Sequence, residues 1–282
     1  MFVFRKTADL QRYLEHVRQS SRLVGFVPTM GALHEGHLEL VRRSLEDSDC
    51  TVVSIFVNPT QFNEQTDFEK YPVDLQKDIM LLHDESCEVV WIPDVDDVYP
   101  DGGTGTPAID LQGLDARMEG KFRPGHFDGV AQVMERLLRL VEPDDLYMGQ
   151  KDFQQTVIIR HLIRSLKLPI RFVMCPTIRE PHGLAMSSRN LLLPDDLRDR
   201  ARVIYLTLDT LRDLTDRYTP ADLQRWAMRA LDIPGFRPEY VEIVDATTLQ
   251  PVDAFEDDEE VVACCAVWAG DVRLIDNVFL KD

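Results

Sequence analysis

The stretch that decides the fold is Leu23-Val24-Gly25-Phe26-Val27-Pro28-Thr29-Met30-Gly31-Ala32-Leu33-His34-Glu35-Gly36-His37. Its first five residues form a short apolar run, which is typical of a buried strand. A helix is expected from about residue 36 to residue 45, and the glycines before it let the backbone turn and approach a ligand. The segment therefore predicts a strand, a tight loop and a helix whose N-terminal N–H groups and dipole favour a phosphate.

The same alternation of strand and helix continues on both sides of this stretch. Helices are predicted around Leu10–Val17, Leu75–Leu82, Phe127–Leu140 and Phe153–Leu166, and strands at Thr51–Val57, Glu88–Ile92, Asp145–Met148 and Pro169–Cys175. Such regular alternation indicates parallel pairing, so we expect an α/β fold with a doubly wound parallel sheet over residues 1–175. Residues 94–114 are rich in Asp, Gly, Pro and Thr and predict a loop.

The pattern changes after residue 175. Two helical stretches, 194–218 and 221–231, precede three β-like runs at 240–244, 261–268 and 272–279. Because turns rather than helices join these runs, they predict a short antiparallel sheet in a second, smaller α+β domain at 176–282. Within it, residues 253–260 carry six acidic side chains out of eight and predict a solvated loop.

The amino-acid composition excludes several classes of function. The chain of 282 residues has 31 Lys and Arg against 49 Asp and Glu, a net charge of −18. This charge argues against nucleic acid or an anionic membrane as the main partner. Five cysteines without a CxxC pair, no signal-like N-terminus and no bilayer-length apolar run predict a cytoplasmic enzyme. Cys264-Cys265 could form a vicinal disulfide, but small thiols buried in a strand fit better.

His34 and His37 lie three residues apart at the start of the expected helix. Their imidazole N–H groups can bind phosphate oxygens and stabilise charge that develops between the α- and β-phosphates. Two alternatives stay open. One is a zinc site, although the HExxH spacing and a Cys/His partner set are absent; the other is a pair of histidines that only cap the helix.

A second candidate for phosphate binding lies far downstream, at residues 178–190. Pro181 and Gly183 predict a turn in a mobile loop, which continues into Met186-Ser187-Ser188-Arg189-Asn190. Hydroxyls and a guanidinium are donors suited to phosphate, although a Ser-Ser-Arg string by itself usually only caps a helix. Paired with the histidines, this segment indicates adenylyl transfer, in which AMP is attached to a carboxylate and the acyl group then passes to a nucleophile.

A third candidate segment, residues 147–155, follows an expected strand and opens an expected helix, where open α/β sheets bind ligands. Gly149 permits close approach, Lys151 can contact phosphate, and Gln155 can reach into the cleft. An exposed lysine at a helix start is the simpler alternative for Lys151.

A fourth segment, residues 56–62, also ends a strand. Asn58 and Gln61 offer neutral donors and acceptors beside apolar walls, which suits a small substrate that carries hydroxyls and a carboxylate. Residues 117–129, with Lys121, Arg123 and His126, add a possible cationic flank.

Seven motifs recur in the order expected of one known family. They are Pro-Thr-Met-Gly-Ala-Leu-His-Glu-Gly-His (28–37), Phe-Val-Asn-Pro-Thr-Gln-Phe (56–62), Arg-Pro-Gly-His-Phe-Asp-Gly-Val (123–130), Gly-Gln-Lys-Asp-Phe-Gln-Gln (149–155), Ala-Met-Ser-Ser-Arg-Asn (185–190), Tyr-Val-Glu-Ile-Val-Asp (240–245) and Arg-Leu-Ile-Asp-Asn (273–277). Together they resemble the pantoate–β-alanine ligase family over essentially the whole chain.

The resemblance implies a Rossmann-like domain with the HIGH-type and KMSKS-type signatures, a small C-terminal domain that lids the cleft, and a homodimer. It implies that ATP, with Mg²⁺, and pantoate give pantoyl adenylate, from which β-alanine displaces AMP, with no tightly bound organic cofactor. The implied catalytic residues are His37, His34 and Lys151. The implied ATP-binding residues are Met30, Gly31, Ala32, Leu33, His34, Glu35, Gly36, His37, Gly149, Gln150, Lys151, Asp152, Ile178, Met186, Ser187, Ser188 and Arg189. Gln61 and Gln155 would bind pantoate, with Gln61 also near β-alanine, and Val133 and Met134 would form the apolar wall.

The sequence departs from the family pattern at a few positions. Met148 stands where an aromatic residue is frequent, and Val272 where Thr is common. Lys77 stands where an acidic residue can help place magnesium, which leaves Asp78 as a candidate and the protein ligands of the metal unknown. Two other functions stay open: a nucleotidyltransferase that stops at the adenylate or makes a dinucleotide, and a catalytically silent nucleotide-binding protein with an acidic partner surface.

Overall fold

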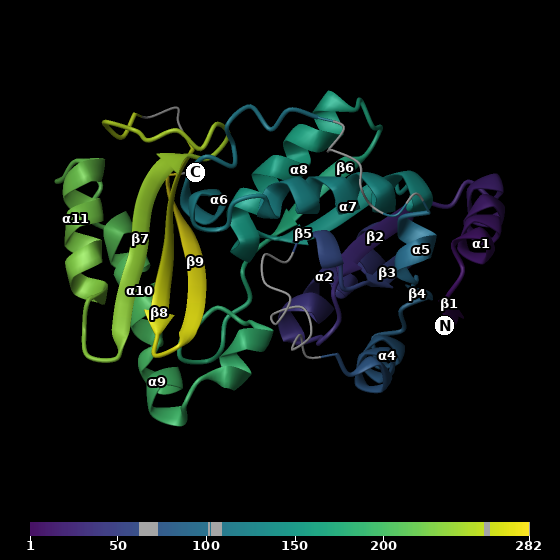
Figure 1. Ribbon diagram of the computed structural model, residues 1–282, viewed down its shortest axis with the longest axis horizontal. Coiled ribbons are helices and arrows are strands. Elements are labelled where there is room, and N and C mark those ends of the chain that lie inside the picture. The colour runs from purple at the N-terminus through teal and green to yellow at the C-terminus, as the bar shows by residue number, and fades with distance from the viewer. Residues whose placement is uncertain (62–72, 101, 103–108, 257–259, 282) are drawn as a thin grey trace. The chain divides into compact units, whose positions relative to one another are not determined.

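The computed structural model describes residues 1–61, 73–100, 102, 109–256 and 260–281 (Figure 1). Phe62 of the 56–62 motif and residues 257–259 of the acidic segment lie outside this set. Contacts between Cα atoms divide the chain into two units. Unit 1 comprises Met1–Gln112, Arg123–Gly149 and Ile158–Cys175, and unit 2 comprises Gly113–Phe122, Gln150–Val157 and Pro176–Asp282. The expected domains, 1–175 and 176–282, stay a proposal.

Unit 1 contains a six-stranded sheet in which every pairing is parallel. Its strands are β1 (Phe2–Phe4), β2 (Val24–Thr29), β3 (Cys50–Ile55), β4 (Val89–Trp91), β5 (Asp145–Gly149) and β6 (Arg171–Cys175). The spatial order β1-β4-β3-β2-β5-β6 confirms the doubly wound sheet. The chain runs outward from β2 through β3 to β4 and then resumes at β5 on the other side of β2. The switch point therefore lies between the carboxyl ends of β2 and β5, where ligands bind in open α/β sheets.

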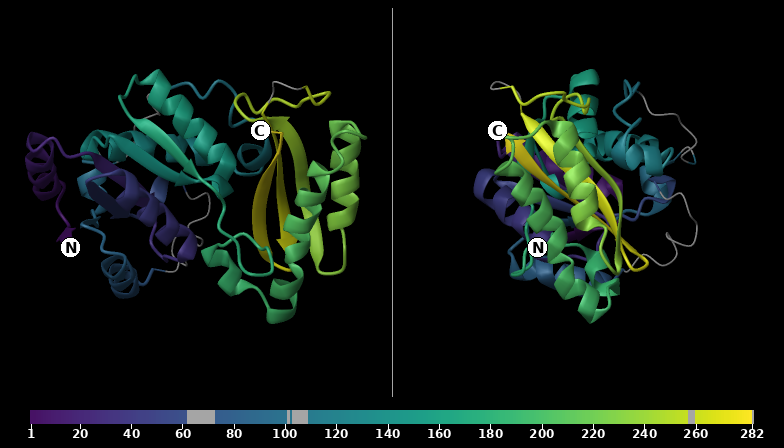
Figure 2. Two further views of the ribbon diagram at one scale, coloured as in Figure 1. Left: turned by 180° about the vertical axis from the view of Figure 1, so that it is seen from behind. Right: turned by 90° about the vertical axis from the view of Figure 1, so that its left-hand side faces the viewer.

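Helices cover both faces of this sheet (Figures 1 and 2). They are α1 (Thr7–Gln19), α2 (Glu35–Asp47), α4 (Leu75–Asp84), the short α5 (Val95–Val98), α7 (His126–Val141) and α8 (Phe153–Ser165). Leu40 of α2 and Leu82 of α4 share one apolar cluster with Val53 of β3, so both helices cover the same face. Right-handed crossovers place α1, α7 and α8 on the opposite face, and α1 packs against α7 there.

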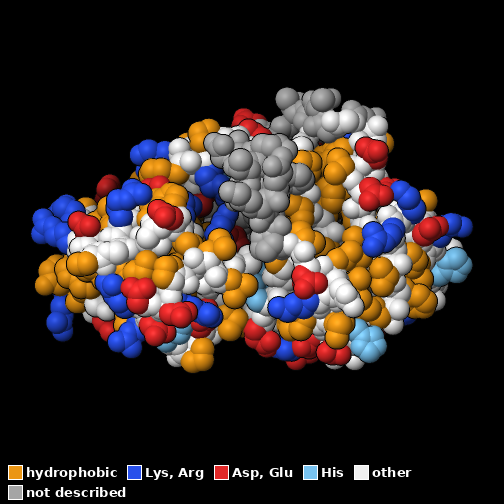
Figure 3. Space-filling view, turned by 60° about the horizontal axis from the view of Figure 1, so that its bottom comes forward, with side chains coloured by type: hydrophobic (Ala, Val, Ile, Leu, Met, Phe, Trp, Pro, Cys, Tyr) orange, Lys and Arg blue, Asp and Glu red, His pale blue; other side chains and the backbone are white. Residues whose placement is uncertain are grey.

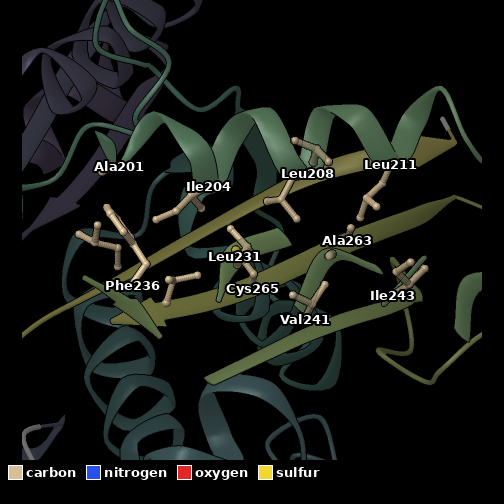
Figure 4. Packing of buried hydrophobic residues seen from close by; sticks show 14 of the residues in the cluster. Ala201, Ile204, Leu208, Leu211, Leu231, Phe236, Val241, Ile243, Ala263 and Cys265 are labelled. Atoms are coloured by element: carbon tan, nitrogen blue, oxygen red, sulfur yellow. The ribbon is translucent and has the colours of Figure 1, made fainter. Parts of the chain in front are cut away.

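Unit 2 is built on an antiparallel sheet of β7 (Phe236–Asp245), β8 (Val261–Ala269) and β9 (Val272–Lys281), as expected. Its helices are α6 (Met118–Phe122), α9 (Asp195–Arg200), α10 (Arg202–Arg212) and α11 (Pro220–Leu231). Figure 4 shows Ile204, Leu208 and Leu211 of α10 pointing toward the sheet that carries Ala263 and Cys265. Apolar residues three and four apart thus bury one face of the helix on the strands.

Four details differ from the sequence expectations. The stretch 194–218 is two helices that meet at Ala201 and end at Arg212, and the expected loop 94–114 contains α5. β1 was not predicted because three residues are too few for a period to show. β7 begins at Phe236, earlier than expected. Pro238 lies at a register irregularity in this edge strand, where proline is tolerated.

The surface charges and the cysteines of the described residues can be compared with the expectations from composition. On the face shown in Figure 3, Lys and Arg side chains of the described residues are interspersed with Asp and Glu. All five cysteines are buried and free, so Cys264 and Cys265 are thiols within β8. Burial raises the pKa of Cys175 to about 11, which keeps it protonated at neutral pH. In the described part of the chain, no helix combines the length and apolar character needed to cross a membrane.

Candidate active site

His34 and His37 lie at the junction between strand β2 and helix α2, within unit 1. β2 ends at Thr29 and α2 begins at Glu35, with His34 as the N-cap residue. Nδ1 of His34 accepts the N–H of Gly36 at 3.2 Å, and Nδ1 of His37 accepts the N–H of His34 at 3.3 Å. The two side chains therefore form a reciprocal capping box at the first turn of the helix.

Capping engages only one nitrogen of each ring. In a neutral imidazole the nitrogen that accepts carries no hydrogen, so Nε2 of His34 and of His37 is the N–H donor. The ring centroids are 4.1 Å apart, which places both rings on one side of the turn. Capping and phosphate binding thus use different atoms and are compatible. Among the described residues, no cluster of three or more His, Cys, Asp or Glu could hold a metal, which disfavours the zinc alternative.

The loop between β2 and α2 is held by Asp78 of α4. Its two carboxylate oxygens accept the N–H groups of Ala32 at 2.9 Å and of Leu33 at 2.8 Å, and the residue is 1% exposed. Gly31 and Ala32 are both left-handed, with φ of 81° and 52°. A Cβ on Gly31 would stand 2.8 Å from the Asp78 carboxylate, so the turn requires glycine there.

The turn after β3 holds the candidate amides of unit 1. Asn58 is 1% exposed: its Oδ1 accepts the hydroxyl of Tyr99 at 2.8 Å, and its Nδ2 donates to Oε1 of Gln61 at 3.2 Å. Nε2 of Gln61 lies 2.9 Å from the sulfur of Met30, so the Gln61 side chain lies beside the β2–α2 loop. Asn58 therefore orients Gln61, and the role of Tyr99 was missed because it lies in the segment predicted as a loop.

Helix α7 forms a wall against this turn. Nδ1 of His126 lies 2.9 Å from the carbonyl oxygen of Gln61. A Cβ on Gly129 would stand 2.4 Å from the carbonyl oxygen of Thr60, so glycine is required for this close approach. Val133 and Met134, the expected apolar wall, lie one turn further on and are buried.

The lysine segment of unit 2 forms a short 3-10 turn, η2 (Gln150–Asp152), directly after Gly149 ends β5. The Lys151 ammonium pairs with Asp152 at 3.5 Å. Gln154, at the start of α8, is buried and donates to the carbonyl oxygens of Leu114 and Arg117 at 2.7 and 3.0 Å. Gln155, the predicted substrate residue, is only partly buried.

The downstream phosphate segment is a hairpin continued by a 3-10 turn. Arg179 pairs with Ala185 in an antiparallel bridge, and the N–H of Met186 donates to the carbonyl oxygen of Ile178 at 2.9 Å. The turn η3 (Ser188–Leu192) follows and is capped by the hydroxyl of Ser187, which accepts the N–H of Arg189.

The end of this segment is tethered to the hairpin. Nδ2 of Asn190 donates to Oε1 of Glu180 at 2.8 Å and to the carbonyl oxygen of Ala185 at 3.0 Å, and Arg198 pairs with Glu180 at 3.0 Å. Residues 187–189 are therefore bracketed by fixed points on both sides.

The predicted site residues thus fall into two groups. Unit 1 holds the β2–α2 loop, Gln61 and Gly149, and unit 2 holds η2, Gln155, Ile178 and residues 186–189. Within each unit, backbone and side-chain hydrogen bonds hold these segments in defined conformations. The sequence indicates Asp78 only as a candidate for magnesium, and it does not identify Glu180 and Asp276 as anchors. For Asp276, the available signal is a polar residue inside a largely apolar strand.

Comparison with known proteins identifies relatives over the full length. The family model described as pantoate-beta-alanine ligase matches residues 2–279. The chain is 44% identical to a pantothenate synthetase of Porphyromonas gingivalis and 45% identical to one of Bacteroides thetaiotaomicron, each alignment covering 100% of both chains.

Solved structures agree. A pantothenate synthetase crystal structure from Thermus thermophilus shares 37% identity and a TM-score of 0.90, covering 100% of both chains. A Francisella tularensis pantoate-beta-alanine ligase, complexed with beta-gamma ATP and beta-alanine, shares 33% identity and a TM-score of 0.79, with 99% of this chain and 98% of that chain covered.

Proposed function

Because the chain belongs to the pantoate–β-alanine ligase family, we propose that it condenses pantoate with β-alanine at the expense of ATP. The enzyme is an ATP-dependent ligase, and the products are pantothenate, AMP and pyrophosphate. The observation that carries the proposal is the capping box of His34 and His37, in which Nδ1 of each ring accepts a backbone N–H at a helix N-terminus and Nε2 is the donor nitrogen.

The reaction proceeds in two steps. A pantoate carboxylate oxygen attacks the α-phosphorus of ATP, the bond to the bridging oxygen breaks, and pyrophosphate leaves. Negative charge that grows on the phosphates is stabilised by the donors of His34 and His37, by Lys151 and by Arg189. The β-alanine amine then attacks the acyl carbon, AMP departs, and the nitrogen loses a proton to give the amide.

Substrate recognition is assigned from the family resemblance, and the chemistry of the side chains is consistent with it. The amides of Gln61 and Gln155 would bind the pantoate hydroxyls and carboxylate, and Val133 and Met134 would contact its methyl groups. Gln61 would also lie near β-alanine. The Francisella tularensis relative complexed with beta-gamma ATP and beta-alanine supports ATP and β-alanine as substrates.

Mg²⁺ is proposed to accompany ATP. Protein sites for this ion commonly use one or two carboxylates together with the substrate phosphates. The candidate carboxylate is Asp78, which is 1% exposed. Both oxygens of Asp78 already accept backbone N–H groups of the β2–α2 loop. The main role of Asp78 would therefore be to hold this loop, and any contact with the ion would come in addition. The ion would neutralise phosphate charge when bound.

A cytoplasmic homodimer is also proposed, in line with the family resemblance and the five free cysteines. The function is tested by incubating the protein with ATP, pantoate and β-alanine and measuring AMP and pantothenate. AMP should be absent when pantoate is omitted. Pyrophosphate release with no amide on addition of β-alanine would instead indicate an enzyme that stops at the adenylate.

A further inference from the structure

Two adjacent polar residues interrupt the apolar strand β9. Asp276 and Asn277 are 3% and 2% exposed. They pair across the sheet with Cys265 and Cys264 of β8. Burying a polar group costs free energy unless the group is hydrogen-bonded. The hydrogen bonds of these two side chains therefore identify the segments of the chain that they support.

Asp276 holds the hairpin that leads to residues 186–189. Its carboxylate receives both terminal nitrogens of Arg179, at 2.7 and 3.0 Å. The same guanidinium donates to the carbonyl oxygen of Gly183 at 3.2 Å and lies 3.9 Å from the ring centroid of Tyr205. Arg179 is therefore clamped from three sides at the base of the hairpin. Burial raises the pKa of Asp276, and the bonds from Arg179 act in the opposite direction.

Asn277 holds the turn that carries Lys151. Its Nδ2 donates to the carbonyl oxygens of Gln150 at 3.0 Å and of Lys151 at 2.9 Å, and its Oδ1 accepts Nε2 of Gln150 at 3.0 Å. The N–H of Asn277 itself donates to the Asp276 carboxylate at 2.8 Å. Neighbouring side chains of a strand point to opposite faces of the sheet. Asp276 therefore binds the hairpin on one face, and Asn277 binds the turn η2 on the other.

We propose that Asp276 and Asn277 are positioning residues for adenylation, which set Lys151 and residues 186–189 in one fixed relation. The inference rests on the proposed function, in which both segments bind the phosphates of ATP. Donors accelerate a reaction only when they are held where charge develops, and a misplacement of about 1 Å can cost about 10²-fold in rate. The dipeptide gives two segments that are distant in sequence a common support in the rigid sheet.

The test uses isosteric substitutions and a control from the same strand. Asn277→Asp keeps the shape but turns an acceptor toward two carbonyl oxygens, and Asp276→Asn removes the charge opposite Arg179. Val278→Ala, at a 3% exposed position in the core of unit 2, weakens the packing of the strand but removes none of the hydrogen bonds that Asp276 and Asn277 make. Arg179→Lys keeps a positive charge opposite Asp276 and replaces Asp276→Asn if that variant does not fold.

Pyrophosphate release in a single turnover and the thermal midpoint are measured for each variant, together with AMP release from supplied pantoyl adenylate and β-alanine. Asn277→Asp should slow pyrophosphate release by about 10²-fold relative to a Val278→Ala variant of similar midpoint, while the second step changes by less than about threefold. Equal rates for these two variants, or equal loss in both steps, would overturn the proposal. Absence of pyrophosphate release by the wild-type protein would instead refute the proposed function.

Discussion

At the scale of single residues, the two nitrogens of each histidine have separate tasks. At the N-cap position of His34 and at the N3 position of His37, Oδ1 of an asparagine can replace Nδ1 as acceptor, whereas its Nδ2 donors do not reach the position of the imidazole Nε2. His34→Asn and His37→Asn should therefore keep α2 capped but slow adenylate formation by about 10²-fold, with a smaller change in ATP affinity. Pre-steady-state pyrophosphate release and thermal unfolding measure the two effects. An unchanged rate of pyrophosphate release in both variants would show that the two histidines only cap the helix.

At the scale of elements, the β2–α2 loop depends on a carboxylate from α4. Asp78→Asn replaces one of two acceptors by a donor, so one buried N–H of Ala32 or Leu33 loses its partner. We expect a loss of about 1–3 kcal/mol in the free energy of unfolding, together with weaker ATP binding and slower adenylation. Urea titration and calorimetry measure these quantities. Asp84→Asn, at an exposed position of the same helix, is the control and should change neither.

A second element, the segment 180–190, has fixed ends and a capped centre. Ser187, Ser188 and Arg189 lie between the tethers at Met186 and Asn190, where a bound nucleotide would add contacts. An acyl adenylate is vulnerable to hydrolysis, so a segment that closes over it would exclude water. Hydrogen exchange across 180–190 should slow when an ATP analogue binds, and Arg189→Ala should reduce this protection. The same exchange rate with and without saturating analogue would rule out a lid.

At the scale of the whole molecule, the proposed ATP-binding residues belong to both units. A ligand that binds only the folded state stabilises whatever it binds, by about 2.7 kcal/mol at one hundred times its dissociation constant. A non-hydrolysable ATP analogue should therefore slow exchange in β2 and β5 of unit 1 and also in β8 and β9 of unit 2. Protection confined to unit 1 would show that residues 150–152 and 186–189 do not bind the nucleotide.

Local sequence determined the elements and their class, because apolar periodicity and turn residues act over a few neighbours. The apolar run at 23–27 and the glycines at 31 and 36 suffice to predict a strand, a loop and a phosphate-binding helix start. The motifs around His34, Lys151 and Ser187 likewise indicate nucleotide chemistry by residue type and spacing alone.

Only tertiary structure decided which groups hold these motifs in place. Asp78 lies 45 residues or more from the loop N–H groups that it accepts, and Asn277 lies 126 or 127 residues from the carbonyl oxygens that it binds. No local period relates such positions, since strand order and helix packing alone bring them together. The capping bonds of Nδ1, which leave Nε2 as the donor, also depend on the folded helix start and could not be derived from the His34–His37 spacing.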